Sequence, residues 1–188
     1  LLNAGVSGKR IAYSPDLGFA TGIDPEVASC CEDAAWAFRE AGAIVDQATP
    51  DWGDPMPIMM DLWPAIWAGR IGDKIDKHRD LIDPALVACA EEGLRQKPET
   101  FFRALVRRVE YCEKFNAFFD RYDFLLTPSV SVPALELGRL RPANYSDHLW
   151  NWFEWAPFTF PFNFAWNPAA SVPAGRTADG RPIGLQIV

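Results

Sequence analysis

The chain lacks a long apolar run, a basic cluster and a glycine-rich phosphate loop. No apolar stretch in its 188 residues reaches the roughly 18 residues needed to cross a bilayer, so we expect no transmembrane helix. Lys and Arg number 18 against 25 Asp and Glu, and the resulting net charge of −7 argues against nucleic acid and against an anionic membrane surface as partners. The absence of Gly-Gly and of Gly-x-Gly argues against a nucleotide-binding loop.

Cysteine and histidine are also scarce. The four cysteines show no C-x-x-C spacing, and we interpret them as buried free thiols of a reducing, cytoplasmic compartment: Cys30, Cys31, Cys89 and Cys112. The two histidines, His78 and His148, lie in no cluster of metal-ligating residues, so we expect neither a metal site nor another cofactor. No basic segment followed by an apolar run opens the chain, which predicts no secretory signal.

The first fifty residues have a strand–helix–strand pattern. Residues 9–14 and 43–45 are strand-like, and Asp24-Pro25 between them is a typical helix start. The spacing of apolar residues predicts a buried helix face, with Gly42 as the C-terminal cap; the face comprises Val27, Cys30, Ala34, Phe38 and Ala41. The pattern predicts a βαβ unit with parallel strands.

Further helices and strands follow. Helices are predicted over residues 58–77, from Asp83-Pro84 to Leu94, and after Pro98. For the last, the predicted buried side comprises Phe102, Leu105, Val109, Cys112 and Phe119. Residues 124–127 are a predicted buried strand, and residues 170–172 and 183–187 a predicted hairpin around Asp179-Gly180.

Residues 150–166 form an aromatic-rich segment, in which nine of the 17 residues are Trp or Phe. The aromatics follow no helical or alternating period. Such a density is typical of a segment that lines a cleft or faces another domain.

No catalytic set can be recognised from the residues alone. Ser129 or Ser131 with His148 and Asp147 would be a candidate triad, but no G-x-S-x-G turn surrounds either serine. We therefore interpret these two serines as hydrogen-bond partners of the backbone near the neighbouring prolines.

Three segments in order along the chain resemble the amidase signature family. They are residues 10–43, with the βαβ pattern; residues 122–128, Tyr-Asp-Phe-Leu-Leu-Thr-Pro; and residues 161–188, from Pro-Phe-Asn-Phe-Ala-Trp to Gly-Leu-Gln-Ile-Val. The resemblance implies an α/β fold with a mixed central sheet flanked by helices, the C-terminal portion of the amidase signature fold. It also implies hydrolysis of a carboxamide C–N bond to carboxylate plus ammonia or amine, or transfer of the ammonia.

The resemblance implies that the catalytic Ser–cis-Ser–Lys groups precede this chain. The sequence contains no Ser-Ser pair, and its five lysines do not stand in the family's catalytic context. We therefore expect an inactive single-domain fragment (1–188), in which sheet and helices occupy 1–128, the loop and aromatic-rich segment 129–166, and the hairpin 167–188. The strand-like end and the start at Leu1 agree with this expectation. Without its partner half, the fragment should expose apolar sheet edges or segment 150–166, which predicts self-association or disorder around residues 140–165.

What this portion contributes, by the resemblance, is a substrate-binding wall. Its expected residues are Trp155, Ala156, Phe158, Thr159 and Asn163. Relatives that bind glutamine-like amides carry Asp seven residues before the Asn that matches Asn163, and Ala156 stands at that position here. With Trp155 and Phe158 nearby, we therefore expect an apolar or aromatic acyl or amine portion in the substrate. A second departure is Trp166, which stands where many members carry Gly and would narrow a channel or fill space.

Two other interpretations remain open. One is a non-catalytic binding module with an exposed aromatic face, and the other is a redox-active thiol protein. For the amidase interpretation, the expected partners are a small-molecule amide and the missing N-terminal half of the polypeptide. A homo-oligomer is left open, and neither nucleic acid nor a membrane is expected.

Overall fold

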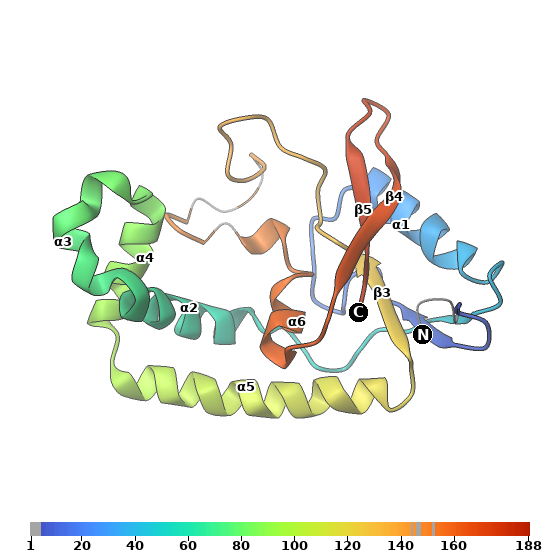
Figure 1. Cartoon of the computed structure of the whole chain (residues 1–188), viewed down its shortest axis with the longest axis horizontal. Helices are drawn as coiled ribbons and strands as arrows, with labels where there is room; N and C mark the ends of the chain where they lie inside the picture. The colour runs from blue at the N-terminus through green and yellow to red at the C-terminus, as the bar shows by residue number, and fades with distance from the viewer. Residues whose placement is uncertain (1–4, 144, 146–147, 152) are drawn as a thin grey trace. The chain divides into compact units, whose positions relative to one another are not determined.

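A five-stranded mixed sheet organises the larger part of the chain (Figure 1). The computed structural model describes residues 5–143, 145, 148–151 and 153–188. The sheet order is β2-β1-β3-β5-β4; its strands are β1 (Arg10–Tyr13), β2 (Ile44–Gln47), β3 (Phe124–Pro128), β4 (Ala170–Arg176) and β5 (Pro182–Ile187). Strand β1 pairs in parallel with β2 and β3, whereas β5 is antiparallel to β3 and β4. The expected mixed α/β sheet is therefore confirmed.

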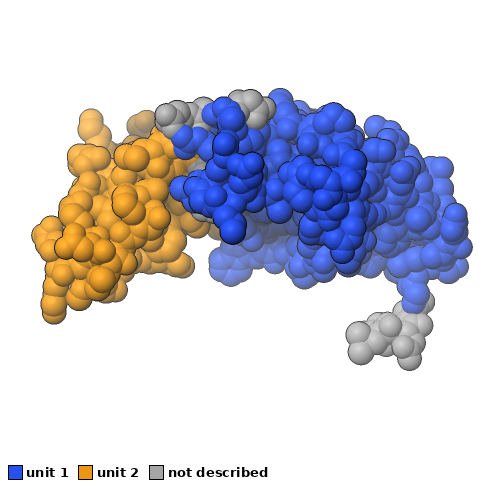
Figure 2. Space-filling model, turned by 90° about the horizontal axis from the view of Figure 1, so that it is seen from above, with its two compact units in different colours: residues 1–54, 112–145, 153–188 blue, residues 55–111, 146–152 orange. Residues whose placement is uncertain are grey.

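The chain divides into two compact units, coloured separately in Figure 2. The first comprises residues 1–54, 112–145 and 153–188 and contains the sheet. The second comprises residues 55–111 and 146–152. Helix α5 (Pro98–Phe119) contributes residues to both.

Helix α1 (Pro25–Ala37) covers one face of the sheet and completes the predicted βαβ unit. The Asp24 carboxylate accepts the Glu26 N–H at 2.8 Å, as its position before Pro25 predicts. Val27 is buried as predicted. The rest of the predicted face was wrong by one residue, because Cys31 and Ala35 are the next buried residues and pack on the strands. The predicted end at Gly42 was also wrong, since the helix ends at Ala37 and Gly42 lies in the following turn with φ +87°.

An aromatic cluster forms in the first unit around Trp52. Its indole stacks on Phe115 with ring centroids 4.5 Å apart, and Phe162 contacts both rings edge-on. Phe162 belongs to α6 (Phe160–Ala165), which follows the short 3₁₀ turn η3 (Phe153–Trp155). The expected exposure of segment 150–166 was therefore wrong for most of its described aromatics, which are buried; those with at most 8% exposure are Trp150, Phe153, Phe158, Phe160, Phe162 and Phe164. Residues 144, 146, 147 and 152 lie outside the described residues.

The second unit is helical. It contains α2 (Met56–Ile71), η1 (Gly72–Lys74), α3 (Ile75–His78), η2 (Arg79–Leu81), α4 (Pro84–Arg95) and the first half of α5. The predicted helix over 58–77 is interrupted at residue 72 by the 3₁₀ turn. The Asp83 carboxylate accepts the N–H groups of Ala85 and Leu86 and caps α4, as predicted.

The buried face of α5 differs from the predicted one. Ala104, Tyr111 and Phe115 are buried, while Phe102 and Val109 are 63% and 56% exposed. The helix carries apolar residues on more than one side, so spacing alone did not identify the face that packs inward.

Candidate functional site

The expected wall residues lie on one anchored segment of the first unit. The Ser131 N–H donates to the Trp155 carbonyl at 3.0 Å, which fixes the end of η3. The Ala156 N–H donates to the Phe153 carbonyl, and the Thr159 hydroxyl donates to the Ala156 carbonyl at 2.9 Å. These bonds hold residues 153–159 in consecutive turns that lead into α6.

The sheet supplies the second anchor of this segment. Leu126 and Leu185 point toward α1, and the alternation along a strand therefore places Thr127 and Gln186 on the opposite face. From that face, the buried Gln186 amide donates to the Phe158 carbonyl at 2.7 Å and to the Thr127 hydroxyl at 3.1 Å. The backbone at Phe158 is thus tied to both β3 and β5.

Within this segment, the expected wall residues differ in accessibility. Ala156 is 5% exposed and Phe158 is completely buried, so within this chain both side chains pack inside the first unit. Thr159 and Trp155 are half-buried, and Asn163 is exposed one helical turn beyond Thr159. The structure thus brings these residues together on one segment while leaving Trp155, Thr159 and Asn163 accessible.

A polar pair that sequence analysis missed lies on the adjacent sheet. The hydroxyl oxygens of Ser129 and Ser171 are 2.6 Å apart, and both residues border Gly184. A Cβ at Gly184 would lie 2.6 Å from the Ser171 Oγ, so only glycine leaves room for the pair. The Ser129 N–H also donates to the Gly184 carbonyl at 3.0 Å.

The alternative serine triad finds no support in the described residues. Ser131 is completely buried, and its backbone is engaged by Asp24 and Trp155. Ser129 bonds to a second serine hydroxyl rather than to the backbone expected for its side chain. The His148 Nδ1 accepts the N–H of Asn151 at 2.9 Å, and the proposed Asp147 lies outside the described residues.

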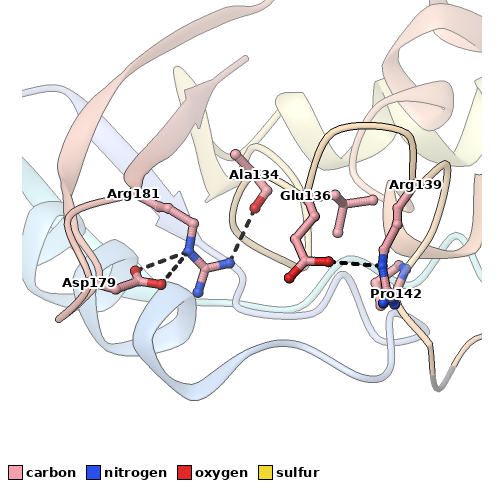
Figure 3. A pocket seen from close by; sticks show the side chains of 7 residues that line it. Ala134, Glu136, Arg139, Pro142, Asp179 and Arg181 are labelled. Atoms are coloured by element: carbon pink, nitrogen blue, oxygen red, sulfur yellow. Dashed lines mark hydrogen bonds and ion pairs between the residues drawn. The ribbon is translucent and has the colours of Figure 1, made fainter.

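A charged cavity of about 430 Å³ lies between the loop at 134–142 and the β-hairpin turn (Figure 3). Two ion pairs line it, Arg181–Asp179 at 2.8 Å and Arg139–Glu136 at 3.1 Å. Hydrogen bonds from Arg181 lower the pKa of Asp179 to about 2. Because its charges are paired and exposed, this cavity does not share the apolar character of the wall.

The four thiols are free, as predicted, but only Cys31 and Cys89 are buried; the predicted burial was wrong for Cys30 and Cys112, which are half-buried. Burial raises the pKa of both Cys31 and Cys89 to about 12, which disfavours the reactive thiolate. In the described part of the chain, no group of three metal-ligating side chains comes together. None of the described helices combines the length and hydropathy needed for a bilayer crossing.

The model of the Amidase family matches residues 3–188, and the chain belongs to this family. Its match to the family extends over both compact units. Solved structures agree on the fold. A 6-aminohexanoate cyclic dimer hydrolase superposes with a TM-score of 0.82 at 23% identity, and the match covers 99% of this chain and 42% of the hydrolase chain. A bacterial aryl acylamidase superposes with a TM-score of 0.80 at 24% identity, over 99% and 41%.

Among curated proteins, the chain is 36% identical to the acylamidase of Rhodococcus erythropolis over 97% of its own length and 39% of the relative's. It is 28% identical to the 6-aminohexanoate-cyclic-dimer hydrolase of Paenarthrobacter ureafaciens, over 95% and 39%. The chain therefore spans about two fifths of the length of these relatives.

Proposed function

We propose that the whole protein hydrolyses the C–N bond of a carboxamide whose acyl or amine portion is apolar or aromatic, and that this chain supplies part of the substrate-binding wall. The observation that carries the proposal is Ala156. This residue occupies the position at which the resemblance places an Asp in relatives that bind glutamine-like amides, and it is 5% exposed.

Desolvation disfavours a charged substrate group at this position. An ammonium group bound beside Ala156 would lose water without gaining a carboxylate partner, which is costly in a buried setting. The neighbours Phe153 and Phe158 are buried and apolar, and Trp155 is half-buried. An apolar substrate portion incurs no such cost. The 36% identity with an acylamidase supports an apolar substrate portion.

The chemistry assigned to this chain is binding and orientation. The resemblance places the nucleophilic serine, the bridging serine and the lysine upstream, where the lysine activates the nucleophile and backbone N–H groups stabilise the tetrahedral intermediate. Thr159 and Asn163 are the polar side chains that this wall offers to the amide. Trp155 offers an aromatic surface beside them.

The test uses the polypeptide with its upstream half in place. We expect kcat/KM to be higher for aryl or fatty amides than for glutamine. Ala156→Asp should raise the ratio of glutamine to aryl-amide kcat/KM about tenfold, because it restores a carboxylate for the ammonium group. Ala156→Asn is the matched control of equal size, and thermal melting checks that both variants fold. A wild-type preference for glutamine would refute the apolar wall.

Residues 1–188 alone should show no amidase turnover, because the expected nucleophile and lysine lie elsewhere. Turnover by this chain that disappears in Ser129→Ala or Ser131→Ala would contradict the proposal. The non-catalytic binding module is the alternative, and the upstream coding sequence discriminates between them. A Gly/Ser-rich stretch with the Ser–Ser–Lys set supports the enzyme, and its absence supports the module.

Compartment and domain organisation belong to the same proposal. The free thiols support a cytoplasmic protein. We further propose that residues 1–188 act as one domain together with the N-terminal half. Fractionation of the native source measures the compartment, and limited proteolysis of the full-length protein tests the domain boundary.

A further inference from the structure

The first half of α5 presents an apolar stripe to solvent. Phe102, Val106 and Val109 are 63%, 59% and 56% exposed, and their spacings of four and three residues place them on one helix face. On the opposite face, Ala104 and Tyr111 are buried in the second unit. The helix therefore packs through one side and leaves a second apolar side uncovered within this chain (α5 in Figure 1).

Opposite charges flank this stripe along one edge. Arg103 and Glu110 are both exposed and stand seven residues apart, which is about 10.5 Å along the helix. That separation is too large for an ion pair within the helix, and among the described residues neither side chain has an ion-pair partner. Glu99 and Glu113 are exposed one turn beyond either end, where they limit the apolar stripe.

We propose that a second copy of this chain docks on the stripe, with the two α5 helices antiparallel about a two-fold axis near Val106. In this arrangement Phe102 faces the second copy's Val109, and Arg103 faces the second copy's Glu110. The two-fold axis makes each contact occur twice. One apolar stripe and one pair of opposite charges on each copy are therefore sufficient for a closed dimer.

The positions of the two charges are complementary to those of a second copy, and they favour the antiparallel direction. Arg103 lies three residues before Val106 and Glu110 four residues after it, so antiparallel pairing sets unlike charges against each other. Parallel pairing would place Arg103 against Arg103 and Glu110 against Glu110. Antiparallel pairing also opposes Glu99 to Glu113 at the ends, which restricts the contact to about two turns and makes the dimer concentration-dependent.

The test measures the dimer dissociation constant of the full-length polypeptide by sedimentation equilibrium. Phe102→Ser should weaken the dimer at least about tenfold. Arg103→Glu and Glu110→Arg should each weaken it about tenfold, because each places like charges opposite one another. The double variant Arg103→Glu/Glu110→Arg exchanges the charges and should restore the affinity to within about threefold of wild type.

The controls separate a lost interface from a lost fold. Lys97→Glu reverses an exposed charge that lies just before α5 and outside the stripe, and it should leave the dissociation constant unchanged. Thermal melting confirms that all variants remain folded. A monomeric wild type, a dimer insensitive to Phe102→Ser, or a double variant no stronger than the single ones would overturn the proposal. A monomer whose stability falls in Phe102→Ser would show instead that another part of the polypeptide covers the stripe.

Discussion

The crossing of α2 and α4 gives a sharp prediction about Gly93. A Cβ built at Gly93 would lie 2.0 Å from the Pro64 carbonyl oxygen and 2.3 Å from its carbon. These neighbours are backbone atoms of the facing helix, so they cannot rotate away as a side chain would. Gly93→Ala must therefore push the two helices apart within the second unit.

Two opposing effects set the magnitude. Inside a helix, Ala is favoured over Gly by about 1 kcal/mol, so the substitution is locally stabilising. Inserting one methyl group into a close-packed contact costs roughly 1–3 kcal/mol, and more where backbone must move. With backbone overlap at 2.0 Å, we expect the packing cost at its upper end and a net loss of about 2 kcal/mol in the free energy of unfolding.

A matched control lies in the facing helix. Gly69 also occupies a helix interior, but its Cβ would meet nothing within 4 Å. Gly69→Ala should therefore gain about 0.5–1 kcal/mol through helix propensity alone. Urea unfolding followed by circular dichroism measures both variants of the full-length protein. A Gly93→Ala protein as stable as wild type, beside a stabilised Gly69→Ala, would refute the close approach.

Two further predictions concern charged side chains. Asp83→Ala removes the cap of α4 and should lower the free energy of unfolding by about 1 kcal/mol, whereas Asp83→Asn should retain most of it, as urea unfolding will measure. The pKa of Asp179 is lowered from 3.8 to about 2 by its bonds to Arg181, so its ion pair favours the folded state above about pH 4 and loses that effect as the pH falls through 2. The stability difference between wild type and Asp179→Asn should therefore be present at neutral pH and vanish below about pH 2, and its persistence there would contradict the assignment.

Short-range signals in the sequence were sufficient for the ends of several elements. Asp24 and Asp83 each precede a proline, and both carboxylates accept backbone N–H groups at the start of their helices. The βαβ unit, β3 and the hairpin with Gly180 at its turn also lie where the pattern indicated. These features depend on backbone groups within a few residues, so local residue types determine them.

The buried faces of helices were harder to infer, for a physical reason. Helix α1 offers two adjacent small apolar stripes, and contact with the sheet selects the one with Cys31 and Ala35. Helix α5 has apolar residues on both the Phe102 and Ala104 sides. Amphipathic spacing reports which residues are apolar, whereas the facing element decides which of them lose solvent.

The polar pair at the candidate site had no local signal at all. Ser129 and Ser171 are 42 residues apart and meet only because β3 and β4 both flank β5. The room for both hydroxyls depends on Gly184 in the intervening strand. Such a contact follows from strand register, which three separate segments determine together.

The anchoring of segment 153–159 bears on how its proposed wall would discriminate between substrates. Its backbone is held by Ser131 at Trp155 and by Gln186 at Phe158, and neither contact involves the accessible side chains. Substitutions that keep the remaining bond of this segment, such as Thr159→Ser, which retains the hydroxyl that donates to the Ala156 carbonyl, should therefore change the surface offered to the amide while the backbone stays in place. A rigid backbone carrying replaceable side chains favours specificity by shape, because a misplaced substrate cannot be accommodated by movement of the wall.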